Sequence, residues 1–179
     1  MFGNIDHFSV STPVSRCGGS LLRRFFVTFV FFAALVSWTF AVSADTIRMT
    51  GKTASGAEQD VTLDEIDLIG FVAERVYNPY EKRRVRYSGV LLDQLVAKYG
   101  DPSVKSVKLT AIDGYRITFE QAEWQEFRIL LVTKLRGKRF DLEQKGPARI
   151  VFPDFTPDEE VHRAKLPKWL WMIQEIRFE

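Results

Sequence analysis

The sequence predicts an α+β domain in which strands outnumber a few short helices, preceded by an N-terminal export signal. Three features predict this class. Apolar and polar residues alternate on both sides of Asp113-Gly114, apolar residues recur with a helical period between Leu92 and Tyr99, and Ile129–Val132 is wholly apolar. Short strands interrupted by short helices are typical of α+β folds.

Residues 1–44 have the layout of a cleavable signal peptide. Arg23-Arg24 precedes an apolar block of 18 residues, Phe25–Val42, and the block ends in the small residues Ser43-Ala44. Charge, apolar run and small-residue site in this order are typical of secretory signals. We therefore expect cleavage after Ala44 and a periplasmic domain of residues 45–179. The alternative is an uncleaved membrane anchor, because a block of this length just spans a bilayer core of about 30 Å.

The charge and cysteine content of residues 45–179 argue against several classes of protein. This part carries 22 basic and 22 acidic residues, a balance that argues against nucleic acid as a partner. The only cysteine of the chain, Cys17, lies before the apolar block. The domain therefore has no disulfide, no thiolate nucleophile and no cysteine metal ligand.

The first half of the domain is expected to contain three strands and one helix. Short strands are expected at 46–49 and 59–63, and a longer one at 68–77 that ends at Asn78-Pro79. The basic run at 82–86 is interpreted as a solvated strand edge that discourages aggregation. A helix follows from Val90, with Ser88 as its N-terminal cap and Gly100 at its C-terminal end. One face of this helix carries Leu92, Leu95, Val96 and Tyr99.

The second half is expected to begin with a β-hairpin, whose strands at 107–111 and 115–119 flank the two-residue loop Asp113-Gly114. Further strands are expected at 129–132 and at 148–152, with a turn at 136–138 between them. Thr156-Pro157-Asp158-Glu159 has the pattern of a capping box, so a short helix is expected to run from there to about Ala164.

Side chains suited to catalysis are scarce after residue 44. His162 is the only histidine there, and the predicted helix places Asp158 and Glu159 on its face. These three could form a weak metal site, but acidic residues in a first helical turn also complement the helix dipole, and we favour that interpretation. No serine has a histidine near it in sequence, and no glycine-rich phosphate loop is present. The sequence therefore favours a non-enzymatic protein, with no catalytic and no metal-ligating residue assigned.

Aromatic side chains are numerous for so small a domain, and most are expected in the core. A subset that lies near Asp113, Arg149, Asp154 or Lys168 would form a flat slot with hydrogen-bonding walls. Such a slot suits a planar heterocycle. The aromatic residues considered are Tyr77, Tyr80, Tyr87, Tyr115, Trp124, Trp169 and Trp171.

Five motifs follow one another along the chain: Tyr87–Leu92, Ala111–Tyr115, Gly137-Lys138, Gly146–Pro153 and Lys168–Trp171, the last running on to Ile176. Together they resemble the molybdopterin-binding domain of the sulfite oxidase family, especially its small stand-alone periplasmic members. The resemblance covers roughly Leu63 to Phe178. It implies the sulfite oxidase-like molybdopterin-binding fold, a mixed sheet with a few short helices.

The chain departs from the enzymes of that family in lacking the cysteine that ligates molybdenum. Without a thiolate the metal loses its protein ligand. The resemblance to small cysteine-free relatives therefore implies a pterin as ligand, no molybdenum, and a non-catalytic sensor. Such relatives look like periplasmic regulators that dock on the sensor domain of a membrane protein that makes or degrades cyclic di-GMP. Two alternatives stay open: a molybdopterin-dependent oxidoreductase subunit, and an accessory scaffold without a ligand.

The resemblance also implies a pterin pocket between the Asp113–Tyr115 hairpin and the Arg149–Trp171 segment. A carboxylate of Asp113 or Asp154 is expected to hold the amino-pyrimidinone edge of the pterin. Lys168 stands where the stand-alone relatives usually carry arginine, and Arg149 lies in the strand after Gly146-Pro147. The rings expected to stack on the pterin are those of Tyr115, Trp169 and Trp171.

Overall fold

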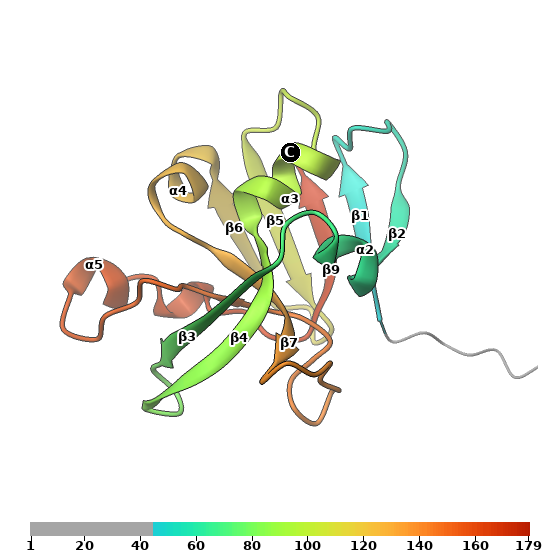
Figure 1. Ribbon diagram of the computed structural model, residues 1–179. Helices are drawn as coiled ribbons and strands as arrows, with labels where there is room; N and C mark the ends of the chain where they lie inside the picture. Colours follow the sequence, from blue (N-terminus) through green and yellow to red (C-terminus); the bar gives the residue numbers. More distant parts are fainter. Residues whose placement is uncertain (1–44) are drawn as a thin grey trace, which may run out of the picture. The chain divides into compact units, whose positions relative to one another are not determined.

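The structure is a computed structural model that describes residues 45–179, and these form two β-sheets with short helices at their edges (Figure 1). The signal peptide expected at 1–44 lies outside the described residues. In chain order the elements are β1 (Thr46–Gly51), β2 (Gln59–Thr62), α2 (Leu63–Asp67), β3 (Val72–Asn78), β4 (Arg83–Leu91), α3 (Leu92–Tyr99), β5 (Ser106–Ala111), β6 (Arg116–Glu120), α4 (Gln121–Glu126), β7 (Leu130–Leu135), β8 (Arg149–Val151), α5 (Glu160–Arg163), the 3-10 helix η1 (Leu166–Lys168) and β9 (Ile173–Phe178).

The larger sheet has five strands in the order β2-β1-β9-β5-β6. Its pairs are antiparallel except for β1 and β9, which run parallel, with Met49 opposite Ile176. The last strand of the chain therefore lies in the middle of this sheet, between the first strand and the β5–β6 hairpin. The sheet is mixed, as expected.

The smaller sheet has four strands in the order β3-β4-β7-β8, all antiparallel. Its register shifts between Ser88 and Gly89 of β4, where the strand passes β7. A bulge of this kind bends a strand and increases its twist.

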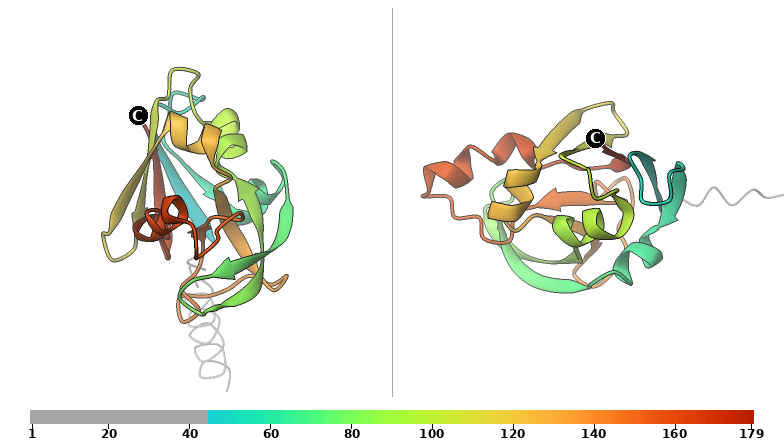
Figure 2. Two further views of the ribbon diagram at one scale, coloured as in Figure 1. Left: turned by 90° about the vertical axis from the view of Figure 1, so that its left-hand side faces the viewer. Right: turned by 90° about the horizontal axis from the view of Figure 1, so that it is seen from above.

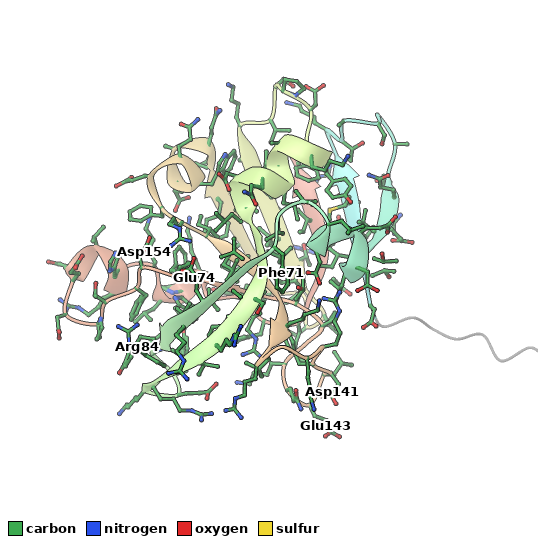
Figure 3. The ribbon with its side chains drawn as sticks, viewed as in Figure 1. Phe71, Glu74, Arg84, Asp141, Glu143 and Asp154 are labelled. Atoms are coloured by element: carbon green, nitrogen blue, oxygen red, sulfur yellow. The ribbon has the colours of Figure 1, made fainter. Side chains whose placement is uncertain are left out.

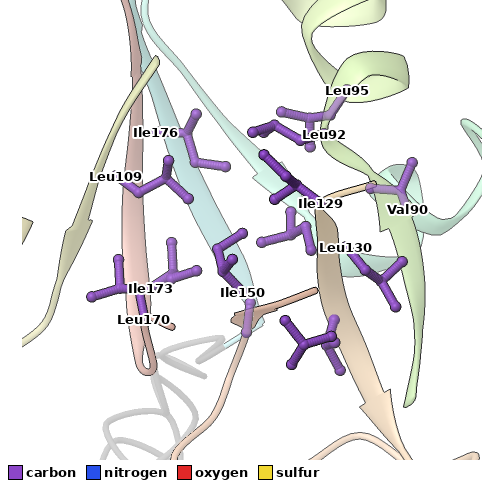
Figure 4. Packing of buried hydrophobic residues seen from close by; sticks show 14 of the residues in the cluster. Val90, Leu92, Leu95, Leu109, Ile129, Leu130, Ile150, Leu170, Ile173 and Ile176 are labelled. Atoms are coloured by element: carbon purple, nitrogen blue, oxygen red, sulfur yellow. The ribbon is translucent and has the colours of Figure 1, made fainter. Parts of the chain in front are cut away.

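The hydrophobic core lies between the two sheets (Figures 2 and 4). It joins side chains of both sheets and of α3, such as Ile176 of β9, Leu130 of β7 and Leu95 of α3, all fully buried. Among the described residues the core extends from Ile47 to Phe178, so its members come from nearly the whole length of this part of the chain.

Most of the predicted strands are present, and the hairpin at Asp113-Gly114 is confirmed with β5 and β6 as its arms. The predicted α3 is also present and ends at Gly100, but it begins at Leu92 after Leu91, without a side-chain cap. The prediction that Ser88 caps it is wrong because Ser88 belongs to β4.

The helix predicted to start after Thr156 is shorter than expected. α5 spans only Glu160–Arg163, and its N-cap is Glu159 rather than Thr156. The Thr156 hydroxyl lies 2.6 Å from Nδ1 of His162 instead. Within residues 45–179, no helix is long and apolar enough to cross a membrane.

Candidate functional site

Backbone hydrogen bonds bring the two segments of the expected pocket side by side. The amide of Ile112, next to Asp113, donates to the carbonyl of Met172 over 2.9 Å. Arg149 at the start of β8 forms an antiparallel bridge with Trp171, and the amide of Ile150 donates to the carbonyl of Leu170 over 2.8 Å. The Trp169–Met172 segment therefore lies between the β5–β6 loop and β8.

Four aromatic rings from three parts of the chain gather on this segment, and we call them the aromatic cluster: Tyr80, Tyr115, Trp169 and Trp171. The ring of Tyr80, in the turn between β3 and β4, meets Trp171 edge-on with centroids 4.9 Å apart. It also lies 6.1 Å from the ring of Trp169. Tyr80 and Tyr115 expose about half of their surface, 52% and 50%, whereas Trp169 is buried.

The two tyrosines of the aromatic cluster are fixed by their hydroxyl groups. Tyr80 donates to the carbonyl of Leu166 over 2.9 Å, and Tyr115 donates to that of Pro167 over 3.3 Å. Burial raises the pKa of the Tyr80 hydroxyl, and the neighbouring Tyr115 raises it further. The Tyr80 hydroxyl therefore stays a protonated donor at neutral pH, and the two hydrogen bonds hold both rings in place while they keep exposed surface.

Two charged groups flank the aromatic cluster. The ammonium of Lys145 lies 4.6 Å from the centroid of the Trp171 ring, and the amide of Met172 donates to the Lys145 carbonyl over 3.4 Å. On the other side Asp113 is exposed, with one carboxylate oxygen accepting from the amide of Tyr115 over 3.0 Å. The arrangement offers flat aromatic surface with a cation at one edge and a carboxylate at another, which suits a planar heterocycle with polar edges.

The side chain of Arg149 is buried and contacts residues outside the aromatic cluster. It is only 4% exposed, and its guanidinium lies 4.7 Å from the ring centroid of Phe140 and donates to the carbonyl of Gln144. Burial lowers the pKa of Arg149, although the nearby Tyr87 and Glu81 raise it. Its Nε has no partner among the described residues. Arg149 thus supports the strand under Trp171 without contributing a free charge to the aromatic cluster.

Lys168 is held by α4. Its ammonium lies 2.7 Å from both carboxylate oxygens of Glu123 and donates to the carbonyl of Thr118 at the same distance. This ion pair ties η1 to α4. Lys145, which the sequence analysis did not single out, is the ammonium that lies on the aromatic cluster.

Asp154 lies in a separate small cleft of about 260 Å³ between the end of α4 and the loop before α5. Its carboxylate is 3.3 Å from Arg128, which also pairs with Glu74 of β3; Glu74 and Asp154 are labelled in Figure 3. Phe155 of this cleft packs edge-on against Trp169 at 5.6 Å. Trp169 therefore forms a wall between the cleft and the aromatic cluster.

A cavity of about 500 Å³, larger than this cleft, lies elsewhere, along the loop after β7. Its lining includes Arg139, Phe140 and Leu142, and two exposed acids of the same loop, Asp141 and Glu143, are labelled in Figure 3. It contains none of the residues expected to bind a ligand.

The side chains of residues 45–179 do not fit a molybdenum ion bound through a protein thiolate. This part of the chain has no cysteine. It also contains no group of three His, Cys, Asp or Glu side chains that could hold a metal ion. His162 binds Thr156 and lies 3.6 Å from Glu159, so its neighbours are those of a helix end rather than of a metal site.

The fold is similar to that of a solved enzyme. The sequence matches no protein-family model and no curated protein. Among solved structures, the chain is similar to the sulfane dehydrogenase SoxCD from Paracoccus pantotrophus, with a TM-score of 0.54 and 15% identity over 76% of this chain. The chain spans about two fifths of that protein, 39% of its length. At this identity the likeness shows the fold alone, and it is compatible with the expected fold class.

The sequence places Tyr115, Trp169 and Trp171 in one region, but it gives no sign of Lys145, and Tyr80 is one of several aromatic candidates that it does not assign to the pocket. Tyr80 follows Asn78-Pro79, a turn signal, and an exposed aromatic residue in a turn is the pattern that could have identified it. No local pattern distinguishes Lys145 from the other lysines, because its position over Trp171 depends on β8 and the Trp169–Met172 segment meeting in the fold.

Proposed function

We propose that the domain is a non-catalytic pterin-binding module whose ligand stacks on the aromatic cluster. Tyr115 and Trp171 supply the stacking surface, the carboxylate of Asp113 pairs with the amino-pyrimidinone edge, and the ammonium of Lys145 faces a carbonyl of the ligand. The observation that carries this proposal is the half-exposed pair Tyr80 and Tyr115, whose hydroxyls are held by the carbonyls of Leu166 and Pro167, with the Tyr80 ring packed against Trp171.

The position of the cluster supports this assignment over the cleft at Asp154. The cluster lies on the hairpin and strand segments that carry the family-like motifs, and it combines flat rings with one cation and one anion. In the cleft, the carboxylate of Asp154 is already paired with Arg128. A pterin edge would have to displace that arginine to reach it.

The proposal is tested by titrating residues 45–179 with oxidised and reduced pterins and following heat and pterin fluorescence. Replacing Tyr115 or Trp171 by alanine removes one stacking surface, worth on the order of 1–3 kcal/mol. We therefore expect Kd to rise by about ten- to a hundredfold. Lys145→Ala is expected to weaken binding, whereas Lys168→Ala acts on stability, because its ammonium is held by Glu123.

Phe71→Ala is the matched control, since Phe71 is an aromatic residue 50% exposed, as Tyr115 is, but lies at the start of β3 away from the cluster. It should leave Kd unchanged. If the wild type binds no pterin at millimolar concentration, the domain is a scaffold without a ligand. If it binds and the cluster variants match the wild type, the ligand lies elsewhere.

Molybdenum is not expected in the purified protein, because residues 45–179 offer no thiolate to hold it. Elemental analysis by mass spectrometry measures this directly. Near-stoichiometric molybdenum would instead favour an oxidoreductase subunit.

By the same resemblance we infer that the domain works in the periplasm after cleavage at Ala44 and regulates a membrane protein that makes or degrades cyclic di-GMP. N-terminal sequencing of the protein from a periplasmic fraction should begin at Asp45, and recovery of Met1 in a membrane pellet would identify an anchored protein. Cells that lack the gene should show a changed cyclic di-GMP level that the wild-type gene restores and the Trp171→Ala variant does not. An unchanged level would rule out the regulatory role and leave pterin binding as a separate question.

A further inference from the structure

A row of arginines crosses the outer face of the four-stranded sheet. In the β3–β4 register Arg75 lies directly opposite Arg86, while Val76 and Val85 beside them are buried on the inner face. The amide of Arg136, in the turn after β7, donates to the carbonyl of Arg86 over 2.9 Å. We call Arg75, Arg86 and Arg136 the arginine row. Neighbouring strands are about 4.8 Å apart, so these charges are close together.

The charges of the arginine row are not neutralised. Within residues 45–179 none of the three forms an ion pair, and Arg84, next to them, donates only to the carbonyl of Arg75. Like charges directly opposite on paired strands destabilise a sheet. Acidic and basic residues are equal in number in residues 45–179. The local excess of arginine on this face therefore comes from where the fold places the arginines, and not from the overall composition.

One exposed apolar side chain borders the same face. Lys134 is the cross-strand partner of Ser88 on this face, and its ammonium lies 4.9 Å from the ring centroid of Phe71. Phe71 is 50% exposed. Phe71 and Arg84 are labelled in Figure 3, at the start of β3 and along the β3–β4 pair. Basic residues beside exposed apolar residues are the combination with which peripheral proteins bind an anionic bilayer.

We propose that this face binds the surface of a bilayer that contains anionic phospholipid. Asp45, where the described chain begins, lines a cavity with Arg139. Arg139 pairs with Asp67, which also pairs with Lys134 on the face of the arginine row. The chain thus enters the domain at the edge of this face, three residues after the apolar block Phe25–Val42. This inference rests on the proposed export, since an exported domain that follows such a block meets a phospholipid surface. The phosphates of that surface complement the unpaired guanidinium groups of the arginine row.

The test is co-sedimentation of residues 45–179 with vesicles of phosphatidylcholine alone and with vesicles that also contain phosphatidylglycerol. We expect binding only to the anionic vesicles, and weaker binding as salt is raised, because salt screens exposed charges. Each basic residue near such a surface accounts for about a fivefold change in partitioning. The triple change Arg75→Glu, Arg86→Glu, Arg136→Glu should therefore weaken binding by at least about a hundredfold. Phe71→Ser should weaken it further without changing its salt dependence.

The matched control replaces three exposed arginines of the five-stranded sheet, Arg48, Arg116 and Arg177, by glutamate, which changes the net charge equally. It should retain binding. If both triple variants lose vesicle binding equally, net charge alone explains the effect and the proposal is overturned. A wild type that does not bind anionic vesicles would also overturn it. Binding to polyglutamate but not to vesicles would also overturn it, in favour of an acidic protein partner. Thermal melting checks each variant, and glutamine at the same three positions replaces glutamate if the first variant does not fold.

Discussion

Gly89 lies at the bulge of β4, where two strands approach more closely than a side chain permits. A Cβ atom at this position would lie 1.9 Å from the carbonyl oxygen of Leu131 and 2.8 Å from its carbonyl carbon, in the neighbouring strand β7. Both are backbone atoms, so no rotamer change relieves the contact. The pairing of β4 with β7 therefore depends on glycine at this position. These two strands lie between the arginine row on the outer face of the sheet and the core on its inner face.

Gly89→Ala should lower the free energy of unfolding by about 3 kcal/mol, the upper range for overpacking a site that cannot give way. Urea denaturation measures this as a lower midpoint with an unchanged slope. Gly114→Ala is the matched control, because nothing lies within 4 Å of a Cβ there and only its positive φ of 84° opposes the change. That strain costs about 1 kcal/mol. Equal losses at the two positions would show that β4 shifts to accept the methyl group.

The sequence was enough to predict which types of side chain form the candidate site, but not which side chains contact one another there. Tyr115, Trp169 and Trp171 could be placed because they belong to motifs whose order fixes their neighbours. Lys168 and Lys145 are both lysines next to such motifs, and the sequence contains nothing that assigns one to Glu123 and the other to Trp171. That choice depends on α4, a helix that sequence reasoning did not find.

At the scale of elements, one carboxylate caps the start of α4 and joins this helix to the segment around η1. Glu123 accepts from the amide of Glu120 over 3.0 Å, which caps the start of the helix, and from the ammonium groups of Lys168 and Lys165 over 2.7 and 3.2 Å. Burial alone raises the pKa of Glu123, but these hydrogen bonds outweigh it and hold the pKa below its usual 4.5.

Glu123→Gln should lower the free energy of unfolding at pH 7 by about 2 kcal/mol, because hydrogen bonds to a charged group are lost and two ammonium groups lose their partner. A carboxyl whose pKa is lower in the folded state stabilises the fold above its unfolded pKa and loses this contribution as pH falls through the folded value. The difference in the free energy of unfolding between the variant and the wild type should therefore become smaller below pH 4.5. Glu126→Gln, an exposed position on the same helix, is the control for denaturation at both pH values. A gap that is constant with pH would contradict the ionic origin.

Elements with a sustained period were predictable, and short ones were not. The hairpin β5–β6 and helix α3 each repeat their pattern over several residues, which is enough to fix their type. α2 and α4 contain five and six residues, too few for a helical period, so the sequence predicts neither helix and only a strand that ends at Leu63. α5 failed in the opposite way: its capping pattern is present, but Thr156 binds His162 rather than the helix start.

At the scale of the whole molecule, both sheets share one core and should unfold together. Calorimetry of residues 45–179 should show a single transition with an enthalpy of about 95 kcal/mol near 60 °C, from about 0.7 kcal/mol for each residue. The calorimetric and van't Hoff enthalpies should agree. Two resolved transitions would mean that the sheets are separate cooperative units, and then the aromatic cluster, which joins hairpins of both, would be lost before the rest of the fold.

The central position of β9 has a consequence for the time at which the domain can form. β9 separates β1 from the β5–β6 hairpin, and Glu179 extends this pairing, since its amide and its carbonyl are both bonded to Ser106. Until β9 has been synthesised, the five-stranded sheet consists of two pieces with unpaired edges. Long-range pairings of this kind also form slowly. The five-stranded sheet therefore closes only after β9 has inserted between β1 and β5.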